Sequence, residues 1–304
     1  MTDVNIDVQL DVDASAGPFG PLIELWITQL SEAFVPDERA RFADLPAQPA
    51  KRRTSQGIPY GKISVDISTD DYPTTVTRTF SDAGLRWLSD LLTDMPTSET
   101  VGSPVKVTAE ISVPDEHGSP TSNQFYAQAE LVEGSPGWLR LQAFTAEADR
   151  RWLDALYPFA DATHPGFGHI AYAYYEGATA LEEATDHRIA APAQWRPDLA
   201  LGHCREWLRG YSWLTIVAAE LVDRLGGADR LRGTGAFVDV RELAKGGLWL
   251  QATDEFRDFT DEAVERVFEA LAPALPSGTP RGLNPRHDQP PLLLVARDPR
   301  DVPA

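Results

Sequence analysis

The sequence predicts an α+β protein with two lobes of mostly antiparallel sheet, each with helices packed on one face. Three observations support this: segments that alternate between apolar and polar residues, segments in which apolar residues recur every three or four positions, and loops rich in proline and glycine. Alternating strands have one dry face and one wet face, which favours an antiparallel or mixed sheet over a buried parallel one.

Period-two alternation marks the expected strands. Between residues 4 and 12, valine, isoleucine and leucine occupy the even positions, and asparagine, aspartate and glutamine occupy the odd ones. The same pattern recurs at residues 63–67, 105–113, 125–131 and 139–142. We expect each segment to bury one face against helices and to leave the other face in water.

Helical periodicity marks four further segments, in which apolar side chains form a single stripe. They cover residues 22–30, 85–95, 152–159 and 264–271. Ser81, Thr145 and Thr260 precede the last three, and their hydroxyl groups are expected to cap the helix N-termini.

Breaks between these segments suggest how the chain is organised. We expect an N-terminal α+β lobe over residues 1–143 and a C-terminal α+β lobe over residues 144–275. Residues 276–304 contain seven prolines in 29 positions, which predicts an extended tail.

The charge balance restricts the possible partners. The chain has 27 basic and 46 acidic residues and a formal net charge of −19. Such a chain repels nucleic acid and anionic membranes, whereas a basic protein is attracted to it. A single cysteine, the lack of a signal-like N-terminus and the lack of a long apolar run predict a cytoplasmic protein.

No recognised catalytic or cofactor motif is present. The sequence lacks the glycine-rich phosphate loops, the GxSxG nucleophile elbow, and the HExxH and CxxC metal motifs. Cys204 is the single thiol, and we expect it to be buried. The sequence therefore predicts no catalytic residue, no metal and no cofactor. An enzyme whose site assembles around His169 and Tyr172 only in the folded chain remains an alternative.

An aromatic strand from His169 to Tyr175 leads into an acidic stretch. Tyrosine combines an apolar ring with a polar tip, which suits a protein interface, although a central strand of the core explains the pattern as well. The candidate partner-binding residues combine these aromatic and acidic side chains. They are Tyr172, Tyr174, Tyr175, Glu176, Glu182, Glu183 and Trp195.

Residues 209–275 carry three short signatures. They are Trp213-Leu214-Thr215, Leu225-Gly226-Gly227 and Gly246-Gly247-Leu248, and they fit a strand, a helix end and a second strand. In this order they resemble the immunity-protein family associated with type VI secretion, formerly a domain of unknown function. The resemblance implies an α+β fold and a role in neutralising a toxin. It implies no role for any single residue.

Three functions therefore compete at this point. The first is a non-catalytic module that binds a protein, such as an immunity protein that neutralises a basic cytosolic toxin. The second is the enzyme centred on His169 and Tyr172. The third is a structural or regulatory homodimer that pairs through a sheet edge or the proline-rich tail.

Overall fold

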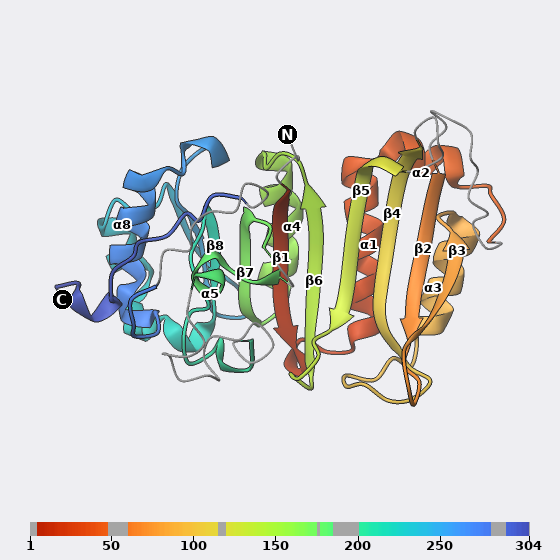
Figure 1. The fold of residues 1–304 in the computed structure, drawn as a ribbon, viewed down its shortest axis with the longest axis horizontal. Helices are drawn as coiled ribbons and strands as arrows, with labels where there is room; N and C mark the ends of the chain where they lie inside the picture. The colour runs from red at the N-terminus through yellow and green to blue at the C-terminus, as the bar shows by residue number, and fades with distance from the viewer. Residues whose placement is uncertain are drawn as a thin grey trace. The chain divides into compact units, whose positions relative to one another are not determined.

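The computed structural model describes six parts of the chain. They are residues 5–47, 60–114, 120–174, 177–184, 201–280 and 290–303. The chain folds into two compact units (Figure 1). Unit 1 comprises Met1–Ala16, Glu133–Ser135 and Thr145–Ala304, and unit 2 comprises Gly17–Val132 and Pro136–Phe144. Of the candidate partner-binding residues, Tyr175, Glu176 and Trp195 lie outside the described residues.

Unit 2 contains an antiparallel sheet with the strand order β3-β2-β4-β5-β6. The strands are β2 (Tyr60–Ile67), β3 (Thr74–Thr79), β4 (Pro104–Pro114), β5 (Pro120–Leu131) and β6 (Trp138–Thr145). The helices of this unit are α1 (Phe19–Phe34), α2 (Pro36–Phe42) and α3 (Asp82–Leu92). Helices α1 and α3 lie on the same face of the sheet (Figure 1), as the amphipathic patterns predicted.

The strand register explains why the helices pack on this face. Val65, Val107, Ala129 and Leu141 pair in one row across four strands, and all four are fully buried. The neighbouring row, which points to the opposite face, consists of polar residues. As predicted, Ser81 caps α3, because its hydroxyl group accepts a hydrogen bond of 3.1 Å from the amide of Gly84.

The strands of unit 1 are also antiparallel and have the order β1-β7-β8-β10-β9. Its strands are β1 (Ile6–Asp13), β7 (Pro165–Tyr172), β8 (Leu214–Val217), β9 (Asp239–Glu242) and β10 (Leu248–Gln251). Its α-helices are α4 (Arg150–Ala162), α5 (Ala180–Glu183), α7 (Gly227–Gly233) and α8 (Asp261–Leu271). The predicted fold class, two antiparallel lobes with packed helices, is thus confirmed.

Some details differ from the sequence predictions. Asp149, rather than Thr145, caps α4, because its carboxylate accepts the amide of Arg151 at 2.9 Å. Strand β1 pairs with β7, from Ile6 opposite Tyr172 onward, so residues 1–16 belong to the same unit as residues 145–304. Pairing between antiparallel strands depends on register and not on closeness in sequence, so alternation alone could not assign β1 to a lobe.

Candidate functional site

Strand β1 of unit 1 is buried on both faces. Asp7, Gln9 and Asp11 point to the face that the alternation predicted to be wet, yet each is completely buried. The prediction of a solvent-exposed face was therefore wrong for this strand. Buried carboxylates are costly unless they are paired and hydrogen-bonded, so the unit has to supply partners for them.

Part of this polar environment comes from the neighbouring strands. Gln9 pairs with His169 on β7, and His169 pairs with Thr215 on β8, so three buried polar residues form a row across the sheet. The Nε2 atom of His169 lies 3.3 Å from Oδ2 of Asp7. The side-chain nitrogen Nε2 of Gln9 donates to Oδ2 of Asp11 at 2.7 Å.

Arg209 lies at the centre of the cluster and is 3% exposed. Its guanidinium donates to Oδ2 of Asp11 at 2.6 Å and to the two carboxylate oxygens of Glu182 at 2.8 and 2.9 Å. Desolvation alone would lower the pKa of Arg209, but the negative charges of Glu182 and Asp11 raise it. Arg209 therefore stays charged and neutralises part of the charge on the two carboxylates.

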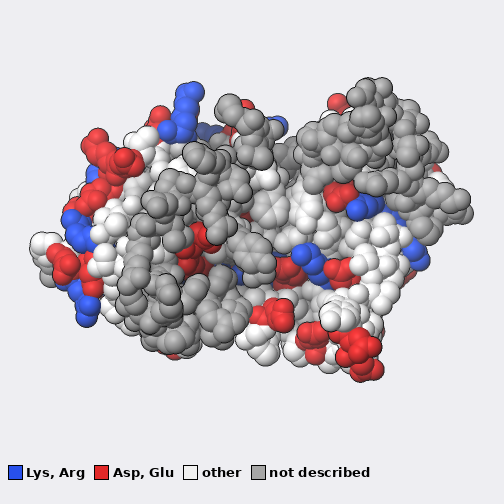
Figure 2. Space-filling view, viewed as in Figure 1, with Lys and Arg blue, Asp and Glu red and all other residues white. Residues whose placement is uncertain are grey.

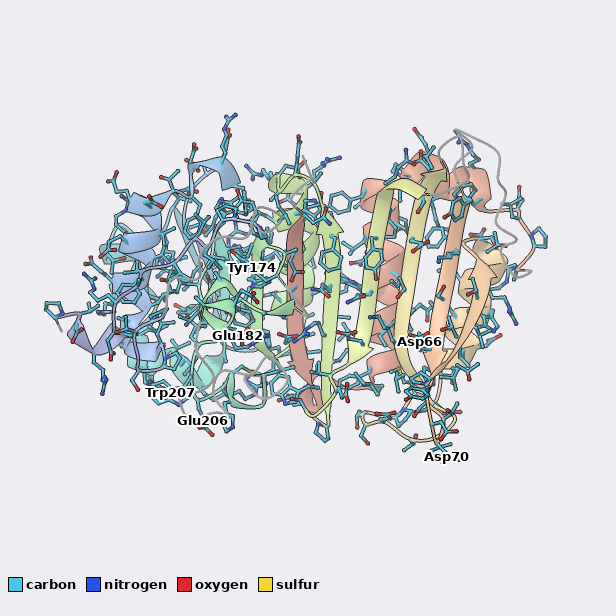
Figure 3. All side chains as sticks on the ribbon, in the orientation of Figure 1. Asp66, Asp70, Tyr174, Glu182, Glu206 and Trp207 are labelled. Carbon is cyan, nitrogen blue, oxygen red and sulfur yellow. The ribbon has the colours of Figure 1, made fainter. Side chains whose placement is uncertain are left out.

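Helix α5 is held in place by the same ion pairs. Thr179 and Glu182 form a capping box, in which the Thr179 hydroxyl accepts from the amide of Glu182 and the Glu182 carboxylate accepts from the amide of Thr179. The Thr179 hydroxyl also donates to the carbonyl of Arg209 at 2.8 Å. Glu182, which the sequence analysis predicted to contact a partner, is buried inside unit 1. Figure 3 labels its position.

His169 and Tyr172 lie on opposite faces of β7. They are three positions apart, and side chains alternate along a strand, so His169 points to the buried polar face and Tyr172 to the other. A single substrate cannot contact both side chains across the strand. The arrangement therefore does not support the enzyme site that the sequence analysis considered around these two residues.

Cys204 is completely buried beside this cluster. Burial raises the pKa of its thiol, and the nearby charge of Asp11 raises it further, although Arg209 and Arg205 oppose this effect. The thiolate is the nucleophilic form of cysteine, so the surroundings of Cys204 keep it inert. The expectation that this cysteine is buried is confirmed.

We expect native protein to resist labelling of Cys204 by a thiol reagent such as DTNB at mildly alkaline pH. Addition of guanidinium chloride should release the full stoichiometric colour, because unfolding exposes the thiol and returns its pKa to the ordinary range. Rapid labelling of the native protein would contradict the burial seen here and would show that the thiol is accessible.

A second ion cluster surrounds Arg205 in unit 1. Its guanidinium contacts Asp13 at 2.8 Å, Glu220 at 3.0 Å and the ring of His164 at 3.3 Å. Burial raises the pKa of Asp13, but hydrogen bonds from Ser15 and Arg205 lower it more, so the net shift is downward. Within the described residues, no group of three or more His, Cys, Asp or Glu side chains could hold a metal ion.

The aromatic candidates pack within unit 1. The ring of Tyr172 meets Phe256 edge-on, with centroids 5.1 Å apart. The hydroxyl of Tyr174 donates to the carbonyl of Pro291 in the tail at 2.7 Å. Burial raises the pKa of the Tyr174 hydroxyl. Tyr172, Tyr174 and Glu183 are each half-buried.

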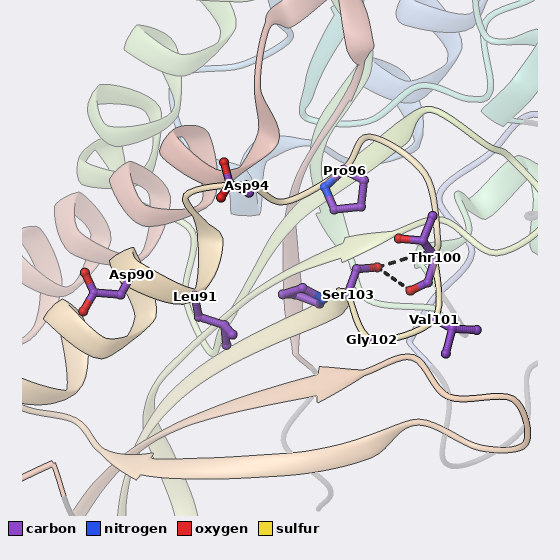
Figure 4. A pocket seen from close by; sticks show the side chains of 9 residues that line it. Asp90, Leu91, Asp94, Pro96, Thr100, Val101, Gly102 and Ser103 are labelled. Carbon is purple, nitrogen blue, oxygen red and sulfur yellow. Dashed lines mark hydrogen bonds between the residues drawn. The ribbon is translucent and has the colours of Figure 1, made fainter.

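Unit 2 contains a groove that the sequence analysis missed. It lies between α3 and the loop before β4 and has a volume of about 450 Å³ (Figure 4). The lining residues are Asp90, Leu91, Asp94, Pro96, Thr100, Val101, Gly102, Ser103 and Pro104. Asp90 and Asp94 are exposed, and Val101 is 67% exposed.

The β2–β3 loop lies beside this groove. The amide of Ser68 donates to the carbonyl of Ser103 at 2.9 Å, and the Ser68 hydroxyl donates to Glu99 at 2.6 Å. This loop carries Asp70, Asp71 and Tyr72, and Tyr72 is 84% exposed. Acidic side chains gather near the position of Asp70 (Figures 2 and 3).

One signal in the sequence could have led to this groove. Residues 63–77 and 87–105 contain six carboxylates and no lysine or arginine. They are Asp66, Asp70, Asp71, Asp90, Asp94 and Glu99. The two segments are separated in the sequence, and the hydrogen bonds of Ser68 join them in the folded unit.

Comparisons with known proteins give information on the fold alone. No family model matches the chain, and no curated protein matches it in sequence. Helices long and apolar enough to cross a bilayer do not occur in the described parts of the chain. Among solved structures, the Pseudomonas aeruginosa T6SS protein PA0821 is similar, with a TM-score of 0.51 and 11% sequence identity. The match covers 92% of this chain and 80% of that protein, so the two proteins share a fold.

Proposed function

We propose that this protein is a non-catalytic binding module that neutralises a basic protein partner in the cytoplasm, in the manner of an immunity protein of type VI secretion. The sequence signatures around residues 213, 226 and 247 support the family, and the shared fold with a T6SS protein is consistent with it. At 11% identity, that likeness supports the fold and leaves the partner to be tested.

The charge distribution is the observation that carries the proposal. Most lysine and arginine side chains of the described residues form ion pairs with carboxylates, from Arg39 with Asp82 to Arg300 with Asp298. The cations are thus largely neutralised, and the excess of 46 acidic over 27 basic residues leaves carboxylates on the surface. A basic protein would be steered to such a surface, and its association rate would be raised.

The side chains that a catalytic site would most readily use are enclosed within unit 1. Cys204 is buried with a raised pKa, and His169 is buried against Asp7. Arg209 and Glu182 are buried in ion pairs with each other. A substrate would have to displace packed side chains of unit 1 to reach these groups.

A pull-down from the native host at low salt tests this proposal. We expect the chain to retain a basic protein. We also expect the rate constant for association of the chain with that protein to fall by about tenfold or more between 0.05 and 0.5 M salt, because salt screens exposed charges. If a neighbouring gene encodes the partner, co-expression of this chain should restore growth of cells that produce it.

Two results would contradict the proposal. One is the absence of any stable basic partner at low salt, and the other is unchanged toxicity of the neighbouring gene product when this chain is present. Light scattering at several protein concentrations separates the homodimer alternative, because self-association depends on concentration and requires no second protein.

A further inference from the structure

The groove of unit 2 combines an apolar floor with an acidic rim. Leu91, Pro96 and Pro104 are partly or fully buried and form the floor, and Val101 stands exposed beside them (Figure 4). Asp90 and Asp94 form the rim and lie four residues apart, at the last turn of α3 and just beyond it. Asp90 belongs to the helix and Asp94 to the turn that follows it, and both side chains line the groove.

These two rim carboxylates are available to a partner. Both are exposed, and neither forms an ion pair with a lysine or arginine of the described residues. This sets them apart from carboxylates such as Glu110 and Glu130, which pair with Lys62 and Lys106 at 3.0 Å.

We propose that this groove is the docking site for a lysine- or arginine-bearing segment of the basic protein partner. The aliphatic part of such a side chain would cover Leu91 and Val101, while its charged end would reach Asp90 and Asp94. This inference rests on the proposed function and names the surface that carries it out.

Tyr72 supplies an exposed aromatic side chain on the β2–β3 loop. It is the most exposed of the large hydrophobic side chains in the described residues, and its loop is joined to the groove loop through Ser68. Exposed tyrosine is favoured at protein interfaces, because its ring buries a large area and its hydroxyl group tolerates water. The acidic rim attracts the partner, and Tyr72 and Val101 bury apolar surface when it docks.

Other occupants fit this surface less well. A Ca²⁺ ion takes six to eight oxygen ligands, whereas the groove rim presents two carboxylates on an open surface. A drug-sized molecule is normally enclosed over most of its surface, and this groove lies open between α3 and the loop (Figure 4). An extended basic segment of a protein can bind with only one of its sides in contact with the groove.

The test uses the full chain and a fluorescein-labelled peptide of alternating arginine and alanine as the probe. The groove variant is Asp90→Asn with Asp94→Asn, and the control is Glu32→Gln with Asp44→Asn. The control removes the same charge from exposed positions of unit 2 outside the groove. A third variant, Val101→Ser, alters the apolar part without changing charge.

We expect the groove variant to weaken peptide binding by about three- to tenfold and the control by less than about twofold, since exposed ion pairs contribute modestly and locally. Chemical shifts of a ¹⁵N-labelled chain should change mainly at residues 90–104 when the peptide is added. Equal losses in the groove variant and the control would show diffuse attraction and overturn the docking site, as would shifts centred elsewhere.

The same variants separate this inference from the proposed function. If the native partner is captured by the groove variant as well as by the unaltered chain, the docking site is wrong and the binding function stands. If no basic partner is captured by the unaltered chain, the proposed function fails whatever the peptide shows. If the groove variant and Val101→Ser lose the native partner while the control retains it, the result supports both the docking site and the proposed binding function.

Discussion

Replacement of Arg209 with methionine is expected to destabilise unit 1 by about 3–5 kcal/mol, the usual cost when one partner is removed from a buried ion pair. The variant leaves Asp11 and Glu182 buried without the guanidinium that contacts both of them at 2.6 to 2.9 Å. It also removes the hydrogen bond from Arg209 to the carbonyl of Gly177, which lies ahead of α5. Hydrogen exchange of peptides from β1, β7 and α5 measures the loss.

Two further variants make this result specific. Arg266→Met breaks an exposed pair with Glu262 on α8 and is expected to cost about 0.5 kcal/mol or less. Combining Arg209→Met with Asp11→Asn and Glu182→Gln should recover part of the lost stability, because the uncompensated charges are removed as well. A loss below about 1 kcal/mol for Arg209→Met alone would show that this cluster is not essential to unit 1.

Replacement of Trp26 with alanine is expected to destabilise unit 2 by about 3–5 kcal/mol. Trp26 lies on the buried side of α1 and is fully inaccessible to solvent, and its indole nitrogen donates to the carbonyl of Gln142 at 3.3 Å. The change opens a large cavity under the sheet, and the surrounding side chains can only partly close it. Hydrogen exchange of β4, β5 and β6 should accelerate, with little change in unit 1.

Tyr72→Ala provides the matching control in unit 2. The side chain is 84% exposed, so its truncation should change the stability of the unit by less than about 0.5 kcal/mol. If Trp26→Ala reduced the stability of unit 2 as little as Tyr72→Ala, the result would contradict the packing of α1 against the sheet described above. The control also shows whether an effect of Tyr72 on partner binding is separate from stability.

Local sequence patterns predicted most of the secondary structure. Alternation identified β1, β2, β4, β5 and β6, because successive side chains of a strand point to opposite faces of the sheet. The apolar stripes identified α1, α3, α4 and α8, and Ser81 was recognised as a cap from its residue type alone. Strands β3 and β9 were missed, because they are short and only partly buried.

The environment of the polar residues was decided by tertiary structure. The polar face of β1 was predicted to meet water, but Asp11 is paired with Arg209, which is 198 positions away in the chain. The residue type of an aspartate or glutamate does not show whether its carboxylate is solvated or buried in an ion pair. Its partner is brought to it only when β1 joins the sheet of unit 1.

The sequence by itself determined the acidic charge, the α+β class and the amphipathic elements, because these depend on composition and on neighbours along the chain. Tertiary structure alone decided that Asp11 and His169 are enclosed and that Asp90 and Asp94 remain exposed beside Val101. Backbone hydrogen bonds from Ser68 and Gly102 join the β2–β3 loop to the loop that lines the groove. Such contacts follow from long-range packing, which leaves no periodic signal in the chain.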